Sequence, residues 1–388
     1  MKKYITENNI KSFFLILFVV LGILRTSTIN IPYFDSICKY IQITSLFILF
    51  IISFIDFIKK KIKLNLFIII LGMFSLINTI VTKHTFFLGF FVFYLSFINL
   101  DYKKAVFKLN ISIIITTILI ILLAITGVIL NDTTTRGTDE LRYLLGFKTS
   151  TLPCSILLFT LINFIIIYRD KLTWPFFLSY ILFALLLYII TDTRTGFLLV
   201  ILTSTIYLLS KNTKIFNFIS KFVNYKAVTV IIYLLPILIF ILEASLVGIY
   251  YLENDLSFQL NKILSTRLSN TKYLIDNYSF SFFGKNIPTK LEDGFYIGSD
   301  LCYFNYLLNY GIISLLLTFY IQFNLIKKSY KSKDLILLLA IIMIIIDGFT
   351  EPYLLDYKYH FIAFISASEL SLLKKSSITK NTNLYLLY

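Results

Sequence analysis

The sequence contains few charged residues. They make up 15% of its 388 positions, whereas a soluble domain carries about a quarter. Charge is also missing from long stretches, because apolar runs of roughly 15 to 22 residues recur along almost the whole chain. These runs are continuous and lack the alternation of a transmembrane β-barrel. The composition therefore excludes an ordinary soluble domain and predicts a polytopic helical membrane protein.

Metal, redox and nucleophile motifs are missing as well. Cys38, Cys154 and Cys302 are scattered and form no Cys-x-x-Cys pair. His84 and His360 are far apart in the sequence, and no further ligands cluster around either. There is no Gly-rich phosphate loop, nucleophile elbow or zincin motif. We therefore expect neither a metal site nor another cofactor.

Twelve apolar segments are predicted to span the membrane as helices, which makes the fold class an all-α transmembrane bundle. Residues 1–388 are predicted to form one membrane-embedded domain. The first segment follows "MKKYITENNIK" and has no small-residue cleavage site, so we expect an uncleaved span rather than a signal peptide. The predicted spans lie near residues 12–30, 37–58, 64–81, 85–100, 109–130, 152–168, 173–191, 196–210, 228–248, 301–326, 335–349 and 357–373.

Basic residues orient these spans. The two termini and every second connector together hold 23 of the 36 Lys and Arg residues, although the other connectors are longer. The positive-inside rule therefore predicts that both termini lie in the cytoplasm and that the number of spans is even. The formal net charge of +15 follows from this topology, and we expect no binding to nucleic acid.

The arginines do not follow the positive-inside rule. Only six arginines are present, and five of them fall on the predicted outer side, whereas 22 of the 30 lysines fall inside. A guanidinium group grips phosphate or carboxylate at two points, while lysine is a solvated point charge. The outer arginines are therefore candidates for binding a phosphate group, although six residues can divide five to one by chance. The five are Arg25, Arg136, Arg142, Arg194 and Arg267.

Four outer connectors carry the candidate site residues. The first is 131–151, with Arg136 and Arg142, and the second is the short turn "TDTRTG", with Asp192 and Arg194. The third is a large loop, 249–300, in which "FQLNKILSTRLSNTKYLI" predicts a short amphipathic helix on the membrane surface. The fourth is the acidic "DGFTEPYLLDYKYH", which contains Asp347, Glu351 and His360.

Each candidate also has a structural interpretation. Arg136, Arg142 and Arg267 could be ordinary solvated charges. Arg194 could pair with Asp192 or extend to water. Asp347 and Glu351 could serve a turn, because Gly348 and Pro352 interrupt any helix there.

Four segments resemble, in order, motifs of the Wzy-type O-antigen and capsular polysaccharide polymerases. "RGTDELRYLLGF" is similar to the family's early arginine-bearing loop, and "TDTRTGFLLVIL" to its "SRTG" stretch. "FFGKNIP…SDLCYFNYLLNYGIISLLL" resembles the end of its large loop, and "DGFTEPYLLDYKYHF" its C-terminal acidic segment. The sequence departs from the family at Asn286, Leu301 and His360, and the first two departures weaken the role of Asp300.

The resemblance implies a metal-independent glycosyltransferase with a helical fold like that of the GT-C enzymes. Such a polymerase joins oligosaccharide units carried on undecaprenyl diphosphate at the outer face of the bacterial cytoplasmic membrane, and the lipid diphosphate is the leaving group. It implies substrate binding by Arg194, Arg267, Arg142, Arg136 and Asp192, catalysis by Asp300, Glu351 or His360, and a chain-length regulator protein as a possible partner.

Three other functions compete with this interpretation, and a sensor or structural membrane protein is the least favoured of them. An O-antigen ligase shares the architecture but transfers the glycan to a lipid or protein acceptor; ligases more often have a His where this chain has Asp300. A flippase or another transporter would typically show repeated halves and ionisable residues in the middle of spans. The sequence shows no internal repeat, and its outer charges gather at span ends.

Overall fold

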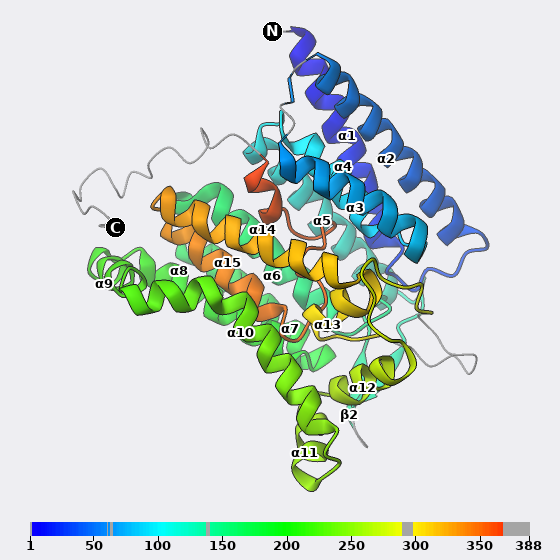
Figure 1. Cartoon of the computed structure of the whole chain (residues 1–388), viewed down its shortest axis with the longest axis vertical. Coiled ribbons are helices and arrows are strands. Elements are labelled where there is room, and N and C mark those ends of the chain that lie inside the picture. The colour runs from blue at the N-terminus through cyan, green and yellow to red at the C-terminus, as the bar shows by residue number, and fades with distance from the viewer. Residues whose placement is uncertain (1, 60, 63–64, 137–139, 289–297, 368–388) are drawn as a thin grey trace.

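The computed structural model describes residues 2–59, 61–62, 65–136, 140–288 and 298–367, and it is almost entirely helical (Figure 1). The longer helices are α1 (Lys2–Leu24), α2 (Phe34–Ile58), α3 (Leu66–Thr82), α4 (Phe86–Phe97), α5 (Tyr102–Ile125), α6 (Leu152–Tyr168), α7 (Trp174–Thr191), α8 (Arg194–Ser210), α9 (Thr213–Val223), α10 (Lys226–Tyr250), α11 (Asp255–Ile263), α12 (Arg267–Asn277), α14 (Ile312–Lys331) and α15 (Leu335–Asp347). Shorter elements are η1 (Arg169–Lys171), α13 (Cys302–Asn305), the π-helix η2 (Tyr306–Tyr310) and the 3-10 helix η3 (Ile362–Ser366).

Apolar helices long enough to cross a membrane confirm the predicted class. Five described helices meet the length and composition of a span, in α1, α2, α5, α7 and α10, and the bent pair α8–α9 would make a sixth. The apolar helices α3, α4, α6 and α15 are shorter. Large apolar side chains are exposed along several of these helices, as a surface that faces lipid requires.

The only sheet among the described residues is a two-stranded hairpin that the sequence did not predict. Strand β1 (Thr133–Arg136) pairs antiparallel with β2 (Glu140–Tyr143), and Thr134 faces Arg142 in the register. Threonines in β1 suit a strand because they are β-branched. The hairpin therefore gives Arg142 a defined position in what the sequence suggested was a long connector.

Two predicted spans differ from the structure. The span predicted over 301–326 is broken at Gly311, which has φ 90°, so that α13 and η2 precede the break and α14 follows it. The span predicted over 357–373 is not a long helix in its described part, which contains only η3. Residues 368–373 lie outside the described part of the chain.

In place of that last helix, residues 352–366 cross the bundle as an irregular chain, which we call the crossing segment. Just before it, Glu351 accepts a hydrogen bond of 3.0 Å from Thr151, at the beginning of α6. Further along, Asn163 of α6 donates to the Tyr359 carbonyl at 3.2 Å. Twelve helical residues separate Thr151 from Asn163, a rise of about 18 Å. The segment therefore runs along α6 from its first turn toward its last.

Side chains from the surrounding helices satisfy the backbone of the crossing segment. Tyr306 accepts from the Leu355 N–H at 3.0 Å, and Tyr102 donates to the Phe361 carbonyl at 3.1 Å. Lys328, near the end of α14, donates to the Ile365 carbonyl. Irregular backbone at membrane depth is tolerated where protein groups pair with it in this way.

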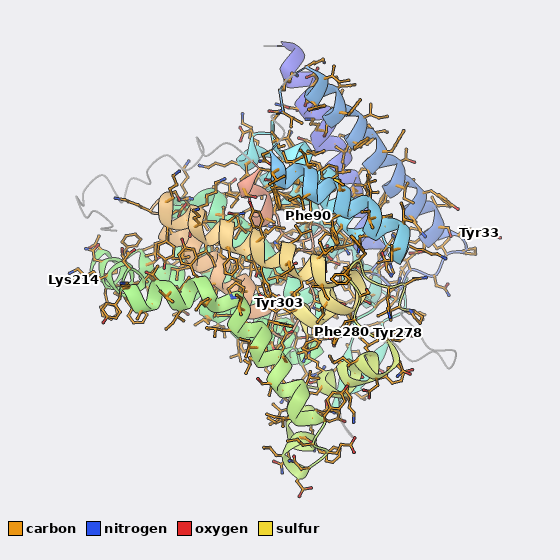
Figure 2. The ribbon with its side chains drawn as sticks, viewed as in Figure 1. Tyr33, Phe90, Lys214, Tyr278, Phe280 and Tyr303 are labelled. Atoms are coloured by element: carbon orange, nitrogen blue, oxygen red, sulfur yellow. The ribbon has the colours of Figure 1, made fainter. Side chains whose placement is uncertain are left out.

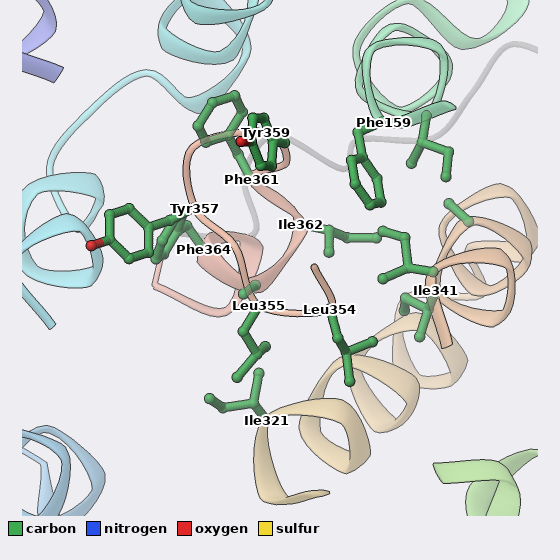
Figure 3. Packing of buried hydrophobic residues seen from close by; sticks show 14 of the residues in the cluster. Phe159, Ile321, Ile341, Leu354, Leu355, Tyr357, Tyr359, Phe361, Ile362 and Phe364 are labelled. Atoms are coloured by element: carbon green, nitrogen blue, oxygen red, sulfur yellow. The ribbon is translucent and has the colours of Figure 1, made fainter. Parts of the chain in front are cut away.

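The crossing segment also forms the centre of the apolar core (Figure 3). Leu354, Leu355, Phe361 and Phe364 are buried, and the ring of Tyr357 lies 4.7 Å from that of Phe93 in α4. The aromatic residues of the segment therefore pack mainly against helices of the N-terminal half of the chain, above all α4. A one-dimensional hydropathy pattern cannot separate such a buried irregular chain from a helical span.

Candidate functional site

The turn between α7 and α8 presents two polar side chains at the end of the bundle. Asp192 follows α7 in the left-handed conformation with φ 47°, and Arg194 is the first residue of α8. Thr193 between them donates a hydrogen bond of 3.0 Å to the Ser150 carbonyl. The turn is therefore anchored to the segment that precedes α6, and it is as short as the sequence predicted.

Asp192 joins two arginines, and we call Arg142, Asp192 and Arg194 the arginine patch. Arg142 donates from Nη2 to the Asp192 carboxylate at 2.9 Å and to its carbonyl at 3.2 Å. Arg194 donates from Nε to the other carboxylate oxygen at 3.2 Å. The Arg142 side chain is 11% exposed and the Arg194 side chain 53% exposed. Two guanidinium groups are thus held side by side, one of them open to the surroundings.

Arg267 lies in a different, buried group. It is the first residue of α12, and Thr266 before it adopts a left-handed conformation with φ 65°. Its Nη2 lies 3.1 Å from Glu351, and its Nε lies 3.9 Å from Asp300. The predicted amphipathic helix of the large loop is in fact two helices, α11 and α12, and the break between them positions this arginine.

Glu351 is the most enclosed partner of Arg267. It is buried, one carboxylate oxygen faces Arg267, and the other accepts the hydroxyl hydrogen of Thr151. Burial raises the pKa of Glu351 to about 7; the Arg267 charge opposes the shift and the Asp300 charge adds to it. A carboxyl group with such a pKa can take up or release a proton near neutral pH.

Asp347 adds a third carboxyl group. The Glu351 N–H donates to the Asp347 carbonyl at 3.0 Å, so the two residues lie one helical turn apart at the end of α15. Asp347 is buried, and neither of its carboxylate oxygens has a hydrogen-bond partner among the described residues. We call Arg267, Asp300, Asp347 and Glu351 the carboxylate cluster, in which carboxyl groups outnumber the arginine.

Asp300 is the more accessible member of the carboxylate cluster. Its side chain is 39% exposed, whereas that of Glu351 is 5% exposed. The hydroxyl group of Ser299 lies 2.8 Å from that of Thr271 in α12, and this contact fixes the end of the large loop beside Arg267. The structure thus brings Asp300, Glu351 and Arg267 together from three separate parts of the chain.

One short segment, Ser150 and Thr151, connects the arginine patch to the carboxylate cluster. Ser150 accepts the hydrogen bond from Thr193 of the turn, and the next residue, Thr151, donates to Glu351. Ser150 and Thr151 were not among the predicted site residues. Their only sequence signal is the run "KTST" before a helix that begins with "LP".

Two glycines explain why widely separated motif segments occur together. Gly284 in "FFGKN" and Gly311 in "NYGII" both have positive φ, and a Cβ on Gly311 would lie 2.3 Å from the Gly284 nitrogen. The Ile312 N–H donates to the Ser281 carbonyl at 2.9 Å, and Asn78 of α3 donates to the carbonyls of Phe283 and Tyr310. The large loop is therefore clamped onto the start of α14.

The remaining predicted residues lie apart from these groups. His360 is buried in the crossing segment, where its Nε2 donates to the Tyr353 carbonyl at 3.0 Å and its ring lies 4.9 Å from that of Phe159. None of the contacts between described residues joins His360 to Arg267, Asp300 or Glu351. Arg136 ends β1, and its side chain lies outside the described part of the structure.

Among the described residues, no group of three or more His, Cys, Asp or Glu side chains is arranged to hold a metal ion. No protein-family model, curated protein or solved structure matches the chain. The arginine patch and the carboxylate cluster are therefore the features of the described residues that point to a function.

Proposed function

We propose that the protein is a glycosyltransferase, specifically a polysaccharide polymerase that joins oligosaccharide units carried on undecaprenyl diphosphate. The observation that carries the proposal is the junction at Ser150 and Thr151. It links a pair of arginines, of which Arg194 is half exposed and Arg142 is mostly buried, to a carboxyl group whose pKa is about 7. Phosphate binding and proton transfer near neutral pH are the two functions that such a reaction needs.

In this proposal the arginine patch binds the diphosphate of the donor. The acceptor hydroxyl oxygen attacks the anomeric carbon, and the bond from that carbon to the diphosphate oxygen breaks. The diphosphate leaves with the electron pair, and the negative charge that develops on it is stabilised by Arg142 and Arg194. The hydroxyl proton passes to the Glu351 carboxylate, while Arg267 and Thr151 hold that carboxylate in place.

Asp300, the first candidate for the proton acceptor from the sequence, becomes the second candidate. It is more exposed than Glu351, but its only described ion pair is the 3.9 Å contact to Arg267. Glu351 is supported better, because its two oxygens have two separate partners and its pKa is already close to neutral.

The proposal includes the predicted topology. Twelve crossings would leave both termini in the cytoplasm of a bacterium and both polar groups at the outer face of its cytoplasmic membrane. The crossing segment supports this arrangement, because its course along α6 would give the chain a last crossing without a long helix.

A transporter is the second candidate function, and the same crossing segment favours it. Discontinuous chain beside buried carboxyl groups is typical of sites that carry ions or substrates across a membrane. An assay on reconstituted protein separates the two functions. The protein is placed in vesicles with an undecaprenyl-diphosphate-linked oligosaccharide that bears a fluorescent label.

We expect a ladder of longer glycans on a gel, together with the release of undecaprenyl diphosphate. Movement of the labelled lipid between leaflets without a ladder would show a transporter and contradict the proposal. A vesicle sample with the Glu351→Gln variant is the control for transfer that does not depend on the site.

A further inference from the structure

Helix α9 is an amphipathic helix at the edge of the molecule (Figure 1). It follows α8 at an angle of 110°, after a break of two residues. Asn212 begins it by accepting hydrogen bonds from the N–H groups of Lys214 and Ile215. If α8 crosses the membrane, a helix bent through this angle lies nearly parallel to the membrane surface.

The apolar face of α9 is only half covered by protein. Phe216 and Ile219 pack against the core, and Val223 is buried. Phe218 and Phe222 lie one turn apart beside that face and are 70% and 58% exposed. An exposed pair of phenylalanines next to a buried face needs an apolar environment other than water.

The polar face and its surroundings are basic. Lys214 and Lys221 are exposed on α9, and Lys211 and Lys226 flank it. No Asp or Glu occurs between Asp192 and Glu243, so no acidic residue close in sequence offsets these charges. Lysines beside exposed phenylalanines on a helix are typical of attachment to anionic membrane surfaces.

Other aromatic side chains lie at the same end of the bundle. Lys211, at the end of α8, donates to the Leu172 carbonyl, which places the start of α7 beside it. Trp174 at that start and Tyr225 just after α9 are both exposed. Aromatic residues gather in this way where a protein meets the interface between lipid and water.

We propose that α9 lies in the headgroup layer of one membrane leaflet and binds anionic phospholipid there. Phe218 and Phe222 enter the upper acyl chains, and Lys214 and Lys221 contact the headgroups. The lysine distribution identifies this leaflet as the cytoplasmic one. The inference does not depend on the proposed function, because it concerns the end of the bundle opposite the arginine patch.

Depth-dependent fluorescence quenching in the full-length protein tests the inference. The chain contains one tryptophan, so Trp174→Phe provides a silent background for Phe218→Trp. The variants are reconstituted in vesicles of phosphatidylglycerol and phosphatidylcholine whose acyl chains carry bromine near the headgroup or near the terminal methyl. A matched variant, Asn217→Trp, places the indole on the polar face of the same helix.

We expect the Phe218→Trp indole to emit at short wavelength and to be quenched more by the shallow bromines than by the deep ones. The Asn217→Trp indole should emit at longer wavelength and be quenched less. Short-wavelength emission without quenching at position 218 would mean that protein, such as a second copy, covers the face. Equal quenching at the two positions would mean that the helix is not oriented in the interface. Either result would overturn the inference.

The lipid preference is tested with mixed vesicles in which only one lipid class is brominated. We expect the Phe218→Trp indole to be quenched more when phosphatidylglycerol carries the bromine. Because a lysine near an anionic surface favours binding by about fivefold, Lys214→Gln with Lys221→Gln should reduce the difference strongly. Equal quenching by the two lipids before these substitutions would overturn the anionic preference.

Discussion

The arginine patch and the carboxylate cluster use the same residue types in opposite proportions. In the patch, two arginines share Asp192, and Arg194 is half exposed. In the cluster, carboxyl groups surround Arg267, which is buried. An exposed group with more cations than anions suits a charged ligand, whereas a buried group with more carboxyl groups retains protons. Arginine is therefore buried among carboxyl groups in one group and, at Arg194, is exposed to the surroundings in the other.

Removing Arg267 should have the largest effect, because it affects both the fold and the site. Arg267→Ala leaves Glu351 and Asp300 without their cation, and breaking a buried pair destabilises a protein by about 3–5 kcal/mol. We expect a lower thermal unfolding temperature in detergent and no polymer. Lys262→Ala, which removes an exposed cation from α11, is the control and should behave as the wild type. An unchanged unfolding temperature in Arg267→Ala would show that the cluster does not depend on its arginine.

Glu351→Gln should abolish transfer and leave the structure largely intact. The amide oxygen can still accept from Arg267, but the side chain can no longer take a proton, and general bases contribute about a hundredfold or more. The rate of ladder formation measures the effect. Glu253→Gln, at an exposed glutamate in the large loop, is the matched control. Normal polymer from Glu351→Gln would show that Glu351 is not the proton acceptor, and Asp300 would then be the candidate.

Arg194→Lys should lower the rate by about a hundredfold without lowering stability. Lysine keeps the charge but loses the planar guanidinium group, which can bind a phosphate at two points. Losing one preorganised contact to a developing anion lowers the rate by about a hundredfold. Because the side chain is half exposed, we expect an unchanged unfolding temperature. Lys83→Gln, at an exposed cation elsewhere, controls for a general effect of charge. A variant with normal polymer length and rate would remove the main support for diphosphate binding at the patch.

Asp192→Asn should have the smallest effect. Asparagine tolerates the left-handed conformation at this position and keeps one oxygen, so the turn is preserved and only the orientation of Arg142 and Arg194 changes. We expect KM to rise roughly threefold to tenfold, with less change in kcat, because asparagine weakens the hydrogen bonds to the arginines without removing them and an ordinary hydrogen bond contributes about 1 kcal/mol. A change in kcat alone would instead indicate that Asp192 acts in the chemical step.

The sequence predicted the parts of this arrangement that depend on local pattern. Hydropathy predicted most of the helices, and the turn "TDTRTG" was placed to within a residue or two. The candidate residues Arg142, Asp192 and Arg194 do form a group, and so do Arg267, Asp300 and Glu351. The structural interpretation of Arg194, a pair with Asp192, is also observed, and it is compatible with ligand binding.

The parts that depend on tertiary contacts were not predictable from pattern. The β-hairpin has only four residues in each strand, and the division between α11 and α12 depends on left-handed residues at Ser265 and Thr266. The crossing segment is apolar and of span length, but side chains of other helices pair with part of its backbone, and its own hydrogen bonds form only short turns and η3. His360 was predicted from its place in a motif, and only the packing shows that its ring lies against Phe159.

The proposed roles, diphosphate binding by the arginine patch and proton transfer by Glu351, are tested most directly by the pH dependence of kcat/KM for glycan transfer. The proton acceptor must be ionised, so activity should fall as the pH drops through about 7, the pKa of Glu351 in the folded protein. Glu351→Asp should move this acidic limb, and Arg194→Lys should lower the whole curve without moving it. A wild-type profile that is flat through pH 7, or a limb that moves in Arg194→Lys and not in Glu351→Asp, would contradict the assignment.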